Sequence, residues 1–573
     1  MNFSFEQCKC LRIKDAVDFG TTFSGVAYYF TGSGKPDPIS ITEWPGTPGL
    51  NPPKTPTLIG YDQDKRSFIW GSKVNATSGS KLEGIKLLLD PNQPTPLFVP
   101  AQITKVELLK LGKPPIDVAT DYIGALYKHA LSQIEKAYPR DYVQMHQKKF
   151  VLTVPAVWSD KAKDVTLRAA RNAGIHPITL IKEPEAAALY TLHFLKNGAL
   201  AIGDAFVLCD AGGGTVDLIS YEVTALDPLE LKELVPGTGG LAGSLMLNRR
   251  FGEFVKNIVG EEDFFALRKT TGFAHAMKTF DQDVKPSFRA DPDQSWFINF
   301  PMTGLKDDPI NNIQSNCLDL KCDAVRQIFE PLITAIDSLV AEQVNRVRIK
   351  RMDENHPKGK DAIFLVGGFG SSQYLKTRLE KANPDIQVIQ PPDAWGAIVK
   401  GAVLSQMPQE AVITSVVAPR HYGVTANNIY RESEDAGQPK IWDKYECIHR
   451  VSKMTWFIIR GDDILRDKRI EFPFYRRLAV DYKPEDLIFV DELLESDVRE
   501  PFKYPSDGVT ILNCKLTADL RKVPRTEFRE KVSVDGTPYI SINYKLFVVT
   551  GASLIFGMTV NGKDIGSVNV DFG

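Results

Sequence analysis

Several features of membrane, secreted and metal-binding proteins are scarce in this sequence. The first residues lack the apolar core of a signal peptide, and the longest apolar stretch, at 547–560, is short and broken by Gly, Ser and Thr. The seven cysteines are scattered without C-x-x-C spacing, which argues against a disulfide framework and a structural zinc site. We therefore expect a cytoplasmic protein, with a nuclear location left open, whose thiols are reduced.

An excess of charge of either sign is also missing, because the 69 Lys and Arg residues nearly balance the 71 Asp and Glu residues. The 573 residues carry a formal net charge of -2 and no sustained block of Lys or Arg, so neither nucleic acid nor an anionic membrane is an expected partner. The eight histidines show no H-x-x-x-H spacing, and no Ser-His-Asp candidate stands out. With 43% hydrophobic and 24% charged residues, the composition is typical of a globular protein with several structural units.

The pattern of the sequence changes once, near residue 405. Before that point strands and helices alternate, and the apolar periodicity predicts helices within 121–138, 159–174 and 183–198. From about Ala418 short alternating runs predict strands, with Ile540, Ile542, Tyr544, Leu546 and Val548 on one face and a hairpin turn at Asn561-Gly562. We expect an α/β domain over 1–405, a linker at 406–417, and an all-β domain over 418–573 that ends in strand pattern without a helical lid.

A turn near the start carries the first hint of chemistry. In AVDFGTTFSGVAYYF (residues 16–30), Asp18 ends an apolar strand, and the turn Gly20-Thr21-Thr22 leads into a second strand. Such a tip offers backbone N–H groups, two hydroxyls and a carboxylate, which suit a phosphate and a metal ion. Taken alone, the same residues also make an ordinary hairpin turn.

The design of this turn is repeated in FVLCDAGGGTVDLISYEV (residues 206–223), where Asp210 precedes a second Gly/Thr turn. Two such hairpins predict two similar lobes, about 14–200 and 201–405, whose turns grip phosphates from opposite sides. Asp18 and Asp210 would then hold a hydrated Mg²⁺ at the floor of the cleft. A third glycine-rich loop, at 362–380, again joins an apolar strand to a helix, whose N-terminus favours an anion or nucleotide.

These motifs together resemble a known family. The segments VDFGTTFSG, KTPTLIGYD, TVPAVWSD, IKEPEAAAL, CDAGGGTVDL and FLVGGFGSS occur in the order found in the nucleotide-binding domain of DnaK-type (heat-shock seventy) chaperones, within the actin-like ATPase superfamily. The resemblance covers about residues 14–405 and implies a two-lobed actin-like (ribonuclease H-like) fold. The segments GTGGLAGSLMLNRRF and MTWFIIRGDDI are more similar to the divergent twelfth-member branch and its fungal relatives.

The resemblance implies a set of site residues. The implied catalytic residues are Asp18, Glu183, Asp210, Thr215 and Asp217, with Glu183 helping to position the attacking water and Asp18 and Asp210 holding Mg²⁺ through water. The implied contacts to ATP or ADP are made by Gly20, Thr21, Thr22, Phe23, Gly212, Gly213, Gly214, Thr215, Gly243, Lys285, Gly367, Gly368, Gly370 and Ser371.

The sequence also departs from the family. Asn75 stands at the position of the family's catalytic lysine, with Lys73 two residues earlier, so we expect slow hydrolysis. Pro286 and Ser371 replace the two arginines that sandwich adenine, which predicts weaker stacking unless an aromatic side chain such as Phe288 or Phe369 substitutes.

Two further residues match the relay between the domains of the family. Pro155 and Lys163 occupy these positions. Their alternative roles are a plain strand terminator and a solvated helix charge.

Three functions remain open from the sequence. The leading hypothesis is an ATP-binding, slowly hydrolysing chaperone-like protein that couples lobe closure to the β-domain and binds unfolded or extended polypeptide clients. The alternatives are a nucleotide-dependent interaction protein that does not hydrolyse ATP and, less favoured, a sugar-kinase-type phosphotransferase. Since EPEAAAL and the β-rich C-terminal region match the chaperones, we favour the first.

Overall fold

The structure is a computed structural model that describes residues 12–31, 37–62, 67–74, 80–90, 101–195, 200–353, 359, 361–407, 412–466, 468–505 and 508–572. Asn75 and residues 408–411 of the expected linker lie outside these ranges. The chain divides into two compact units. The first comprises residues 1–158, 165–231 and 237–412, and the second comprises 413–573 with the short segments 159–164 and 232–236.

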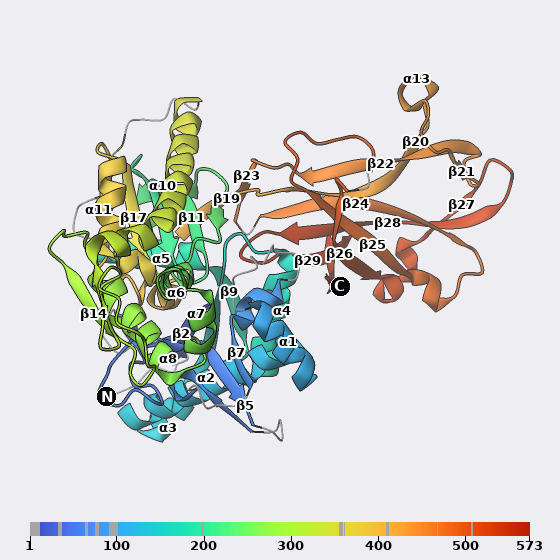
Figure 1. The fold of residues 1–573 in the computed structure, drawn as a ribbon. Coiled ribbons are helices and arrows are strands. Elements are labelled where there is room, and N and C mark those ends of the chain that lie inside the picture. The colour runs from blue at the N-terminus through green and yellow to red at the C-terminus, as the bar shows by residue number, and fades with distance from the viewer. Residues whose placement is uncertain are drawn as a thin grey trace. The chain divides into compact units, whose positions relative to one another are not determined.

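The first sheet of the larger unit is built around the N-terminal hairpin (Figure 1). Strand β1 (Arg12–Asp18) pairs antiparallel with β2 (Phe23–Phe30) and parallel with β8 (Gln147–Val154), and β8 pairs parallel with β9 (Ile178–Lys182). The short strands β3 (Ile39–Ser40) and β4 (Thr55–Pro56) both pair with β2. The apolar runs of β1 and β8 are buried, as expected for central strands covered on both faces.

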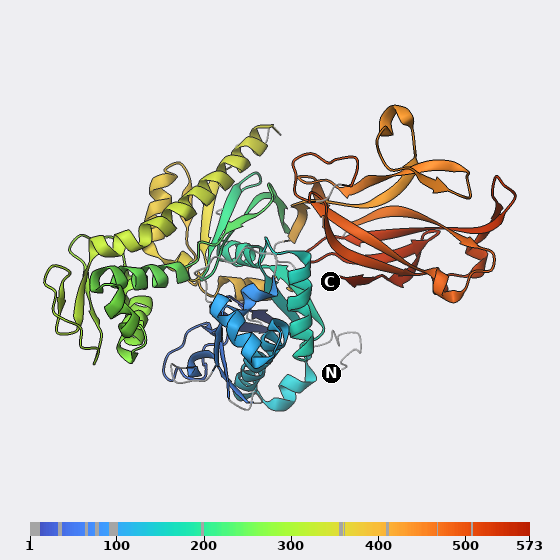
Figure 2. The same ribbon diagram turned by 45° about the vertical axis from the view of Figure 1, so that its right-hand side comes forward.

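The central strands of a second sheet repeat this topology, and that sheet has further strands. Strand β10 (Ala205–Ala211) pairs antiparallel with β11 (Val216–Leu226) and parallel with β17 (Asp361–Val366), and β17 pairs parallel with β18 (Gln387–Ile389). Figure 2 shows the two sheets apart from each other, the first in blue to cyan and the second in green to yellow. The prediction of two similar lobes, made from the repeated hairpin, is therefore confirmed.

Two helices join the lobes. Helix α5 (Glu183–Leu195) packs on α12 (Ala397–Leu404), and between them they contact strands of both sheets. Their close approach requires Gly401, because a Cβ atom there would lie only 1.7 Å from the carbonyl oxygen of Ala186. The sequence places Glu183, a predicted site residue, at the first position of α5, next to the interface between the lobes.

The predicted helices are confirmed as α2 (Pro115–Ala137), α4 (Asp160–Asn172) and α5. Beyond the two central sheets the larger unit has further helices at α1 (Ala101–Leu111), α3 (Arg140–Met145), α6 (Leu245–Val259), α7 (Glu261–Leu267), α8 (Thr271–Thr279), α9 (Lys285–Ser287), α10 (Cys322–Asp353) and α11 (Gln373–Ala382), and strands at β5 (Leu58–Tyr61), β6 (Phe68–Trp70), β7 (Ser80–Glu83), β13 (Thr238–Gly240), β14 (Ser295–Asn299), β15 (Ile313–Gln314) and β16 (Cys317–Lys321). Strand β12 (Leu229–Glu233) lies at its boundary. Within the described ranges, no helix combines the length and apolarity needed to cross a bilayer.

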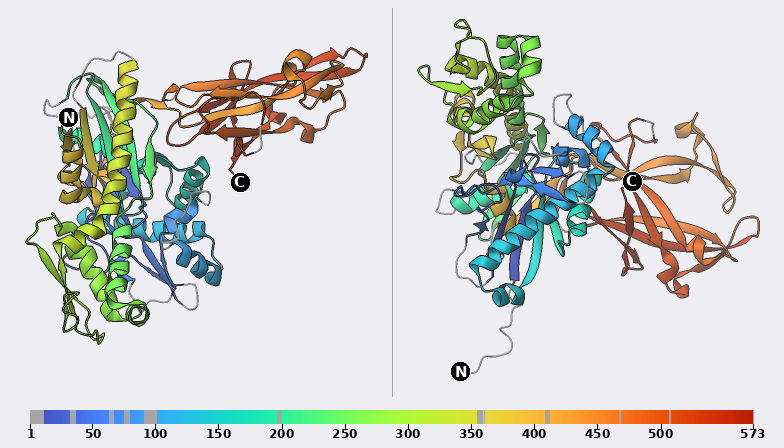
Figure 3. Two further views of the ribbon diagram at one scale, coloured as in Figure 1. Left: turned by 45° about the horizontal axis from the view of Figure 1, so that its top comes forward. Right: turned by 60° about the horizontal axis from the view of Figure 1, so that its bottom comes forward.

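The smaller unit is rich in β-strands, as predicted, and its strands form two main sheets (Figure 3). One runs β21 (Ile441–Asp443), β22 (Ile448–Ile458), β20 (His421–Ile429), β25 (Ile488–Ser496), β26 (Ile511–Asp519) and β31 (Asn569–Asp571). The other runs β24 (Arg469–Ala479), β28 (Pro538–Val549), β29 (Ile555–Val560) and β30 (Lys563–Ser567), with β27 (Arg529–Val532) also paired to β28. Strands β19 (Val412–Val417) and β23 (Asp463–Leu465) and helix α13 (Glu432–Asp435) complete the unit.

The predicted inward face of β28 is confirmed. Its five apolar residues, Ile540, Ile542, Tyr544, Leu546 and Val548, are each at most 4% exposed. The predicted turn joins β29 to β30, and Asn561 and Gly562 both adopt positive φ angles, of 49° and 77°. This is the backbone conformation that makes Asn-Gly a favoured two-residue hairpin turn.

One buried charge in the first sheet has consequences for stability. Asp15, on β1, is 1% exposed, and burial raises the pKa of its carboxyl to about 7, although Lys148 and the hydroxyl of Tyr127 oppose the shift. Between its ordinary pKa of 3.8 and about 7, the folded protein keeps a proton that the unfolded chain releases. The free energy of unfolding must therefore fall as pH rises through this window.

We expect the Asp15→Asn variant to lose this part of the pH dependence. Relative to the wild type it should gain about 1–3 kcal/mol in unfolding free energy on going from pH 4 to pH 8, because the neutral amide has no ionisation to suppress. Urea denaturation at both pH values measures this change. Asp141→Asn, at an exposed carboxylate of the same lobe, is the control. Parallel pH profiles for wild type and Asp15→Asn would show that Asp15 does not retain the proton.

Candidate functional site

The first glycine-threonine turn connects β1 to β2 and is hydrogen-bonded by a residue outside the hairpin. The hydroxyl of Thr57 donates a hydrogen bond to the carbonyl oxygen of Gly20, with 2.8 Å between the oxygens. A Cβ atom on Gly20 would lie 2.1 Å from the carbonyl oxygen of Phe23, so the tight turn excludes a side chain there. Thr21, Thr22 and Phe23 are all half-buried at its tip.

The second turn meets the first directly. It is closed by a hydrogen bond from the backbone N–H of Gly212 to the carbonyl of Thr215, at 2.9 Å. A Cβ atom on Gly213 would lie 2.0 Å from Oγ1 of Thr22, and one on Gly214 would lie 2.8 Å from Cγ2 of Thr21. The two glycine-rich tips, about 190 residues apart in the chain, therefore face each other as the sequence predicted.

Two more glycine-containing segments pack against the second turn and the aspartate that precedes it, Asp210. The backbone N–H groups of Ser244 and Leu245, at the start of α6, donate to the carbonyls of Gly212 and Gly213. A Cβ atom on the preceding residue, Gly243, would lie 2.2 Å from the Gly213 carbonyl oxygen. The third predicted loop approaches from the other side, since Gly367 adopts a φ of 91° and its Cβ position lies 2.4 Å from Oδ1 of Asp210.

Beneath these loops lies a buried acidic cluster. Asp18, Glu183, Asp210 and Asp217 are 1%, 7%, 4% and 1% exposed. Thr215 donates its hydroxyl hydrogen bond to Oδ2 of Asp217, at 2.9 Å. The sequence predicted all five residues, and the structure brings them together at the point where the two hairpins meet.

Sequence reasoning missed two lysines in this cluster. Nζ of Lys54 lies 2.6 Å from Oδ2 of Asp18, and this lysine is only 6% exposed. Lys86, on the short 3₁₀ helix Ile85–Leu89, is 2% exposed and its ammonium donates to Oε1 of Glu183 while lying over the ring of Trp158. The signal for Lys86 was a lone lysine in the apolar run GIKLLL. Lys54 stands in KTPTLIGYD, one of the segments that resemble the family.

The charges shift one another's pKa values. Burial opposes ionisation of Asp18, but the adjacent Lys54, helped by Lys86, holds its pKa below the ordinary value. Burial favours the neutral form of Lys54, yet Asp18, with Asp210 and Glu183 further away, raises the pKa of its ammonium.

The remaining acids hold their protons more tightly. Burial, followed by repulsion from neighbouring carboxylates, raises the pKa of Asp210 well above its usual range and that of Glu183 to about 7. Burial also raises the pKa of Asp217. A cation bound here would reverse part of these shifts, because it stabilises the ionised carboxylates.

The carboxylates differ in what they offer a metal ion. Oδ1 of Asp210 and Oδ1 of Asp217 are buried and have no hydrogen-bond partner among the described residues, so they fit a hydrated cation such as Mg²⁺. Both oxygens of Asp18 are engaged, Oδ2 by Lys54 and Oδ1 by the hydroxyl of Thr153 at 2.8 Å. Over the described ranges, no group of three or more His, Cys, Asp or Glu side chains is arranged to hold a metal ion directly.

The residues expected near the nucleotide base differ in their exposure and in their hydrogen bonds. Lys285 is present at the start of α9, where its ammonium donates to Asp281 at 2.6 Å and to Asn248 at 3.0 Å. Ser371 is exposed and bonds back to the carbonyl of Gly368, and Gly370 is buried beside it. Pro286 is exposed.

The aromatic residues considered as substitutes for the family's arginines are buried instead. Phe288 is 0% and Phe369 is 4% exposed, and both pack against Phe329. Neither presents an open ring face, so they do not replace the stacking arginines as the sequence suggested. The half-buried Trp395, which packs edge-on against Phe23 and lies beside Gly368, is the aromatic side chain at this edge of the loops.

The remaining residues singled out in the sequence are Lys73, Pro155 and Lys163. Lys73 is exposed, so among the described lysines it is Lys54 and Lys86 that reach the buried carboxylates. Pro155 is buried just after β8. Lys163 is not a solvated helix charge, because it is 8% exposed and its ammonium lies 3.4 Å from Oδ1 of Asp160.

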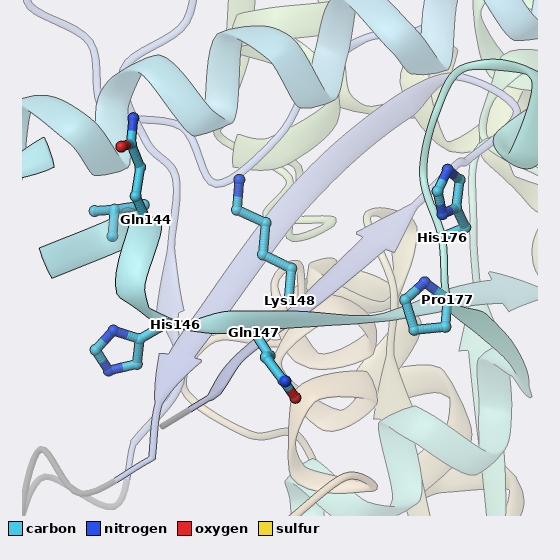
Figure 4. Close-up of a pocket in the computed structure, with 7 residues that line it drawn as sticks. Gln144, His146, Gln147, Lys148, His176 and Pro177 are labelled. Atoms are coloured by element: carbon cyan, nitrogen blue, oxygen red, sulfur yellow. The ribbon is translucent and has the colours of Figure 1, made fainter. Parts of the chain in front are cut away.

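A hollow of about 490 Å³ elsewhere in the larger unit does not compete with this site. It is lined by residues 143–144, 146–148 and 176–177. Figure 4 shows Lys148 and Gln147 on opposite sides of β8, with His146 and His176 well apart on either side of them. Because these side chains do not converge, the hollow lacks the constellation that acid-base or metal chemistry needs.

Comparisons with known proteins agree with this geometry. The family model described as Hsp70 protein matches residues 103–225. The chain is 25% identical over 516 residues to Heat shock 70 kDa protein 12A of Homo sapiens, covering 73% of each chain, and 24% identical over 507 residues to the human 12B protein, covering 72% of this chain and 71% of the relative. It is 25% identical over 430 residues to Chaperone protein DnaK of Carsonella ruddii (strain PV), covering 70% of this chain and 64% of the relative.

Proposed function

The chain is an Hsp70-like member of the actin-like ATPase superfamily, close to the twelfth-member branch, and we propose that it binds ATP between its two lobes, hydrolyses it slowly and acts as a chaperone-like protein. One observation carries the proposal. Two glycine-threonine turns, from sheets whose central strands share one topology, meet above a buried cluster of four carboxylates. Turns of this kind cradle phosphates with backbone N–H groups, and carboxylates beneath them suit a hydrated cation.

The residues divide the work as follows. The turns at Gly20–Phe23 and Gly212–Thr215 hold the phosphates, and Asp210 with Asp217 would hold Mg²⁺ through water. A bound Mg²⁺ supplies charge that neutralises the phosphate oxygens. The ionised carboxylate of Glu183 orients the attacking water, and Lys86 fixes that carboxylate by its hydrogen bond. We assign Lys86 the role that the family's lysine would have at Asn75, which explains how hydrolysis is retained at a low rate.

Nucleotide binding is expected to raise the thermal stability of the purified chain. A ligand at 100 times its Kd that binds only the folded state adds about 2.7 kcal/mol, so millimolar Mg·ATP or Mg·ADP should increase Tm measurably. The matched control is Mg²⁺ with triphosphate alone. No shift with any nucleotide at millimolar concentration would contradict the proposal. Turnover measured beside it should be well below the range of about 1–1,000 per second typical of enzymes.

The Asp210→Asn variant separates the leading proposal from the alternatives. It keeps the shape of the site but removes a carboxylate, so hydrolysis should fall at least about 100-fold while nucleotide still shifts Tm. A wild-type rate no higher than that of Asp210→Asn would favour the interaction protein that does not hydrolyse ATP. A phosphorylated small molecule formed from ATP would favour the phosphotransferase.

Extended polypeptides are the proposed clients of the β-rich unit. The support is strand β24, which pairs with β28 along all of Arg469–Ala479 and has no strand partner on its other edge among the described residues. Such an edge can add a peptide strand through main-chain hydrogen bonds. Pro473, near its middle, lacks an N–H and would limit the pairing.

A client held only at this edge should dissociate rapidly, with a half-life of about seconds or less, since pairing along one edge leaves the peptide exposed. Stopped-flow release of a fluorescent extended peptide measures the rate. The same peptide with alternate amides N-methylated is the control, because it cannot donate those hydrogen bonds and should not bind. A complex that survives dilution for minutes would contradict edge binding.

A further inference from the structure

Lys54 places a buried ammonium among the carboxylates of the site. Its ammonium contacts Asp18 at 2.6 Å, and the charges of Asp210 and Glu183 also act on it. Three of the four buried carboxylates, Asp18, Asp210 and Glu183, therefore interact electrostatically with this one ammonium. A metal ion bound among the same side chains would neutralise the same charges.

The surrounding backbone is shaped to admit this lysine. Lys54 directly precedes β4, which pairs with the first hairpin at β2. A Cβ atom on Gly25, in β2, would lie 3.1 Å from Cγ of Lys54 and 2.9 Å from the carbonyl oxygen of Pro53. The absence of a side chain at Gly25 thus lets the lysine stem pass under the phosphate turn, with 6% of the residue exposed.

Both carboxylate oxygens of Asp18 accept hydrogen bonds from side chains of the protein. One oxygen accepts from Lys54 and the other accepts from Thr153, so both are already hydrogen-bonded within the protein. Asp210 and Asp217 each keep one buried oxygen without a partner in the described part of the chain. One of the two carboxylates predicted to hold Mg²⁺ through water, Asp18, thus stands in an internal ion pair with Lys54.

We propose that Lys54 is a resident cation of the phosphate site, so that this protein binds nucleotide phosphates with little dependence on Mg²⁺. The inference rests on the proposed nucleotide-binding function and goes beyond it. An ammonium has three N–H donors, of which Asp18 takes one, and the others can donate to phosphate oxygens. Mg²⁺ at Asp210 and Asp217 is then needed for hydrolysis rather than for holding the nucleotide.

The test is the affinity for ADP, measured by isothermal titration calorimetry in Mg²⁺ and in excess EDTA. ADP is used because it is not hydrolysed, so the measurement reports binding alone. For the wild type we expect Kd to rise by less than about tenfold when Mg²⁺ is removed, because Lys54 continues to neutralise the phosphates.

Two variants isolate the role of Lys54. Lys54→Met alone leaves Asp18 buried without its partner and can fail to fold, so Lys54→Met/Asp18→Asn, which removes both charges, is measured beside it. In the double variant, EDTA should raise Kd by at least about 100-fold. Lys73→Met, at an exposed lysine of the same lobe, is the control and should behave as the wild type.

The outcomes separate this inference from the function on which it rests. If the wild type binds ADP in Mg²⁺ but loses more than about 100-fold in EDTA, the resident-cation proposal is wrong and the nucleotide-binding proposal stands. If the double variant, folded by circular dichroism, responds to EDTA no more than the wild type does, Lys54 is not the cation. If ADP binds under neither condition, the proposed function itself is overturned.

Discussion

Replacement of Lys86 by methionine is expected to slow ATP hydrolysis about 100- to 1,000-fold, the range found when a preorganised charge is removed from an active site. Methionine keeps the length and apolar stem of the side chain but cannot donate to Oε1 of Glu183. The freed carboxylate would then lose its orientation, and its pKa, already raised to about 7, would rise further without the opposing charge. The measurement is the single-turnover rate of ATP hydrolysis.

The pH profile of the rate distinguishes a positioning role from a loss of structure. If Lys86 keeps Glu183 ionised, the pH at which the residual rate reaches half its maximum should move upwards in Lys86→Met. Lys73→Met is the matched control, since Lys73 is exposed and lies in the same lobe. An unchanged rate in Lys86→Met, or an equal loss in Lys73→Met, would refute the assignment of Lys86 to the role expected at Asn75.

A single methyl group at Gly243 should have an effect of similar size on nucleotide binding. In Gly243→Ala the new Cβ atom would lie 2.2 Å from the carbonyl oxygen of Gly213 and 2.4 Å from the carbonyl carbon of Gly214. These are backbone atoms of the second phosphate turn, which have no rotamer through which to move aside. We expect ADP affinity to fall at least about 100-fold and the unfolding free energy to fall by about 1–3 kcal/mol.

Gly252→Ala provides a control within the same helix, α6. The nearest atom to its Cβ position is Cζ of Phe273, at the ordinary contact distance of 3.9 Å. Because alanine favours a helix by about 1 kcal/mol over glycine, this variant should bind ADP normally and be equally or more stable. Titration calorimetry and urea denaturation of both variants make the comparison. Normal ADP binding by Gly243→Ala would show that the start of α6 does not fix the turn.

The sequence by itself determined the parts of this protein that depend on local rules. Strand alternation, the helices around α2, α4 and α5, and the Asn561-Gly562 turn were all predictable, because backbone conformation and one-sided burial follow from neighbouring residues. The two glycine-threonine hairpins were recognisable for the same reason. Their repetition also predicted the two lobes, since similar segments of chain fold into similar units.

Only the tertiary structure decided which lysines pair with the buried carboxylates and which aromatic rings are buried. Lys54 is 36 residues from Asp18 in the chain, and Lys86 is 97 residues from Glu183. No local pattern specifies either pair, because both depend on where β4 and the 3₁₀ helix dock against the first sheet. The burial of Phe288 and Phe369, which removes them as stacking surfaces, is likewise a result of long-range packing. Local sequence rules fix the backbone of each turn, whereas electrostatic partners are chosen by the packing that brings distant segments within a few ångströms.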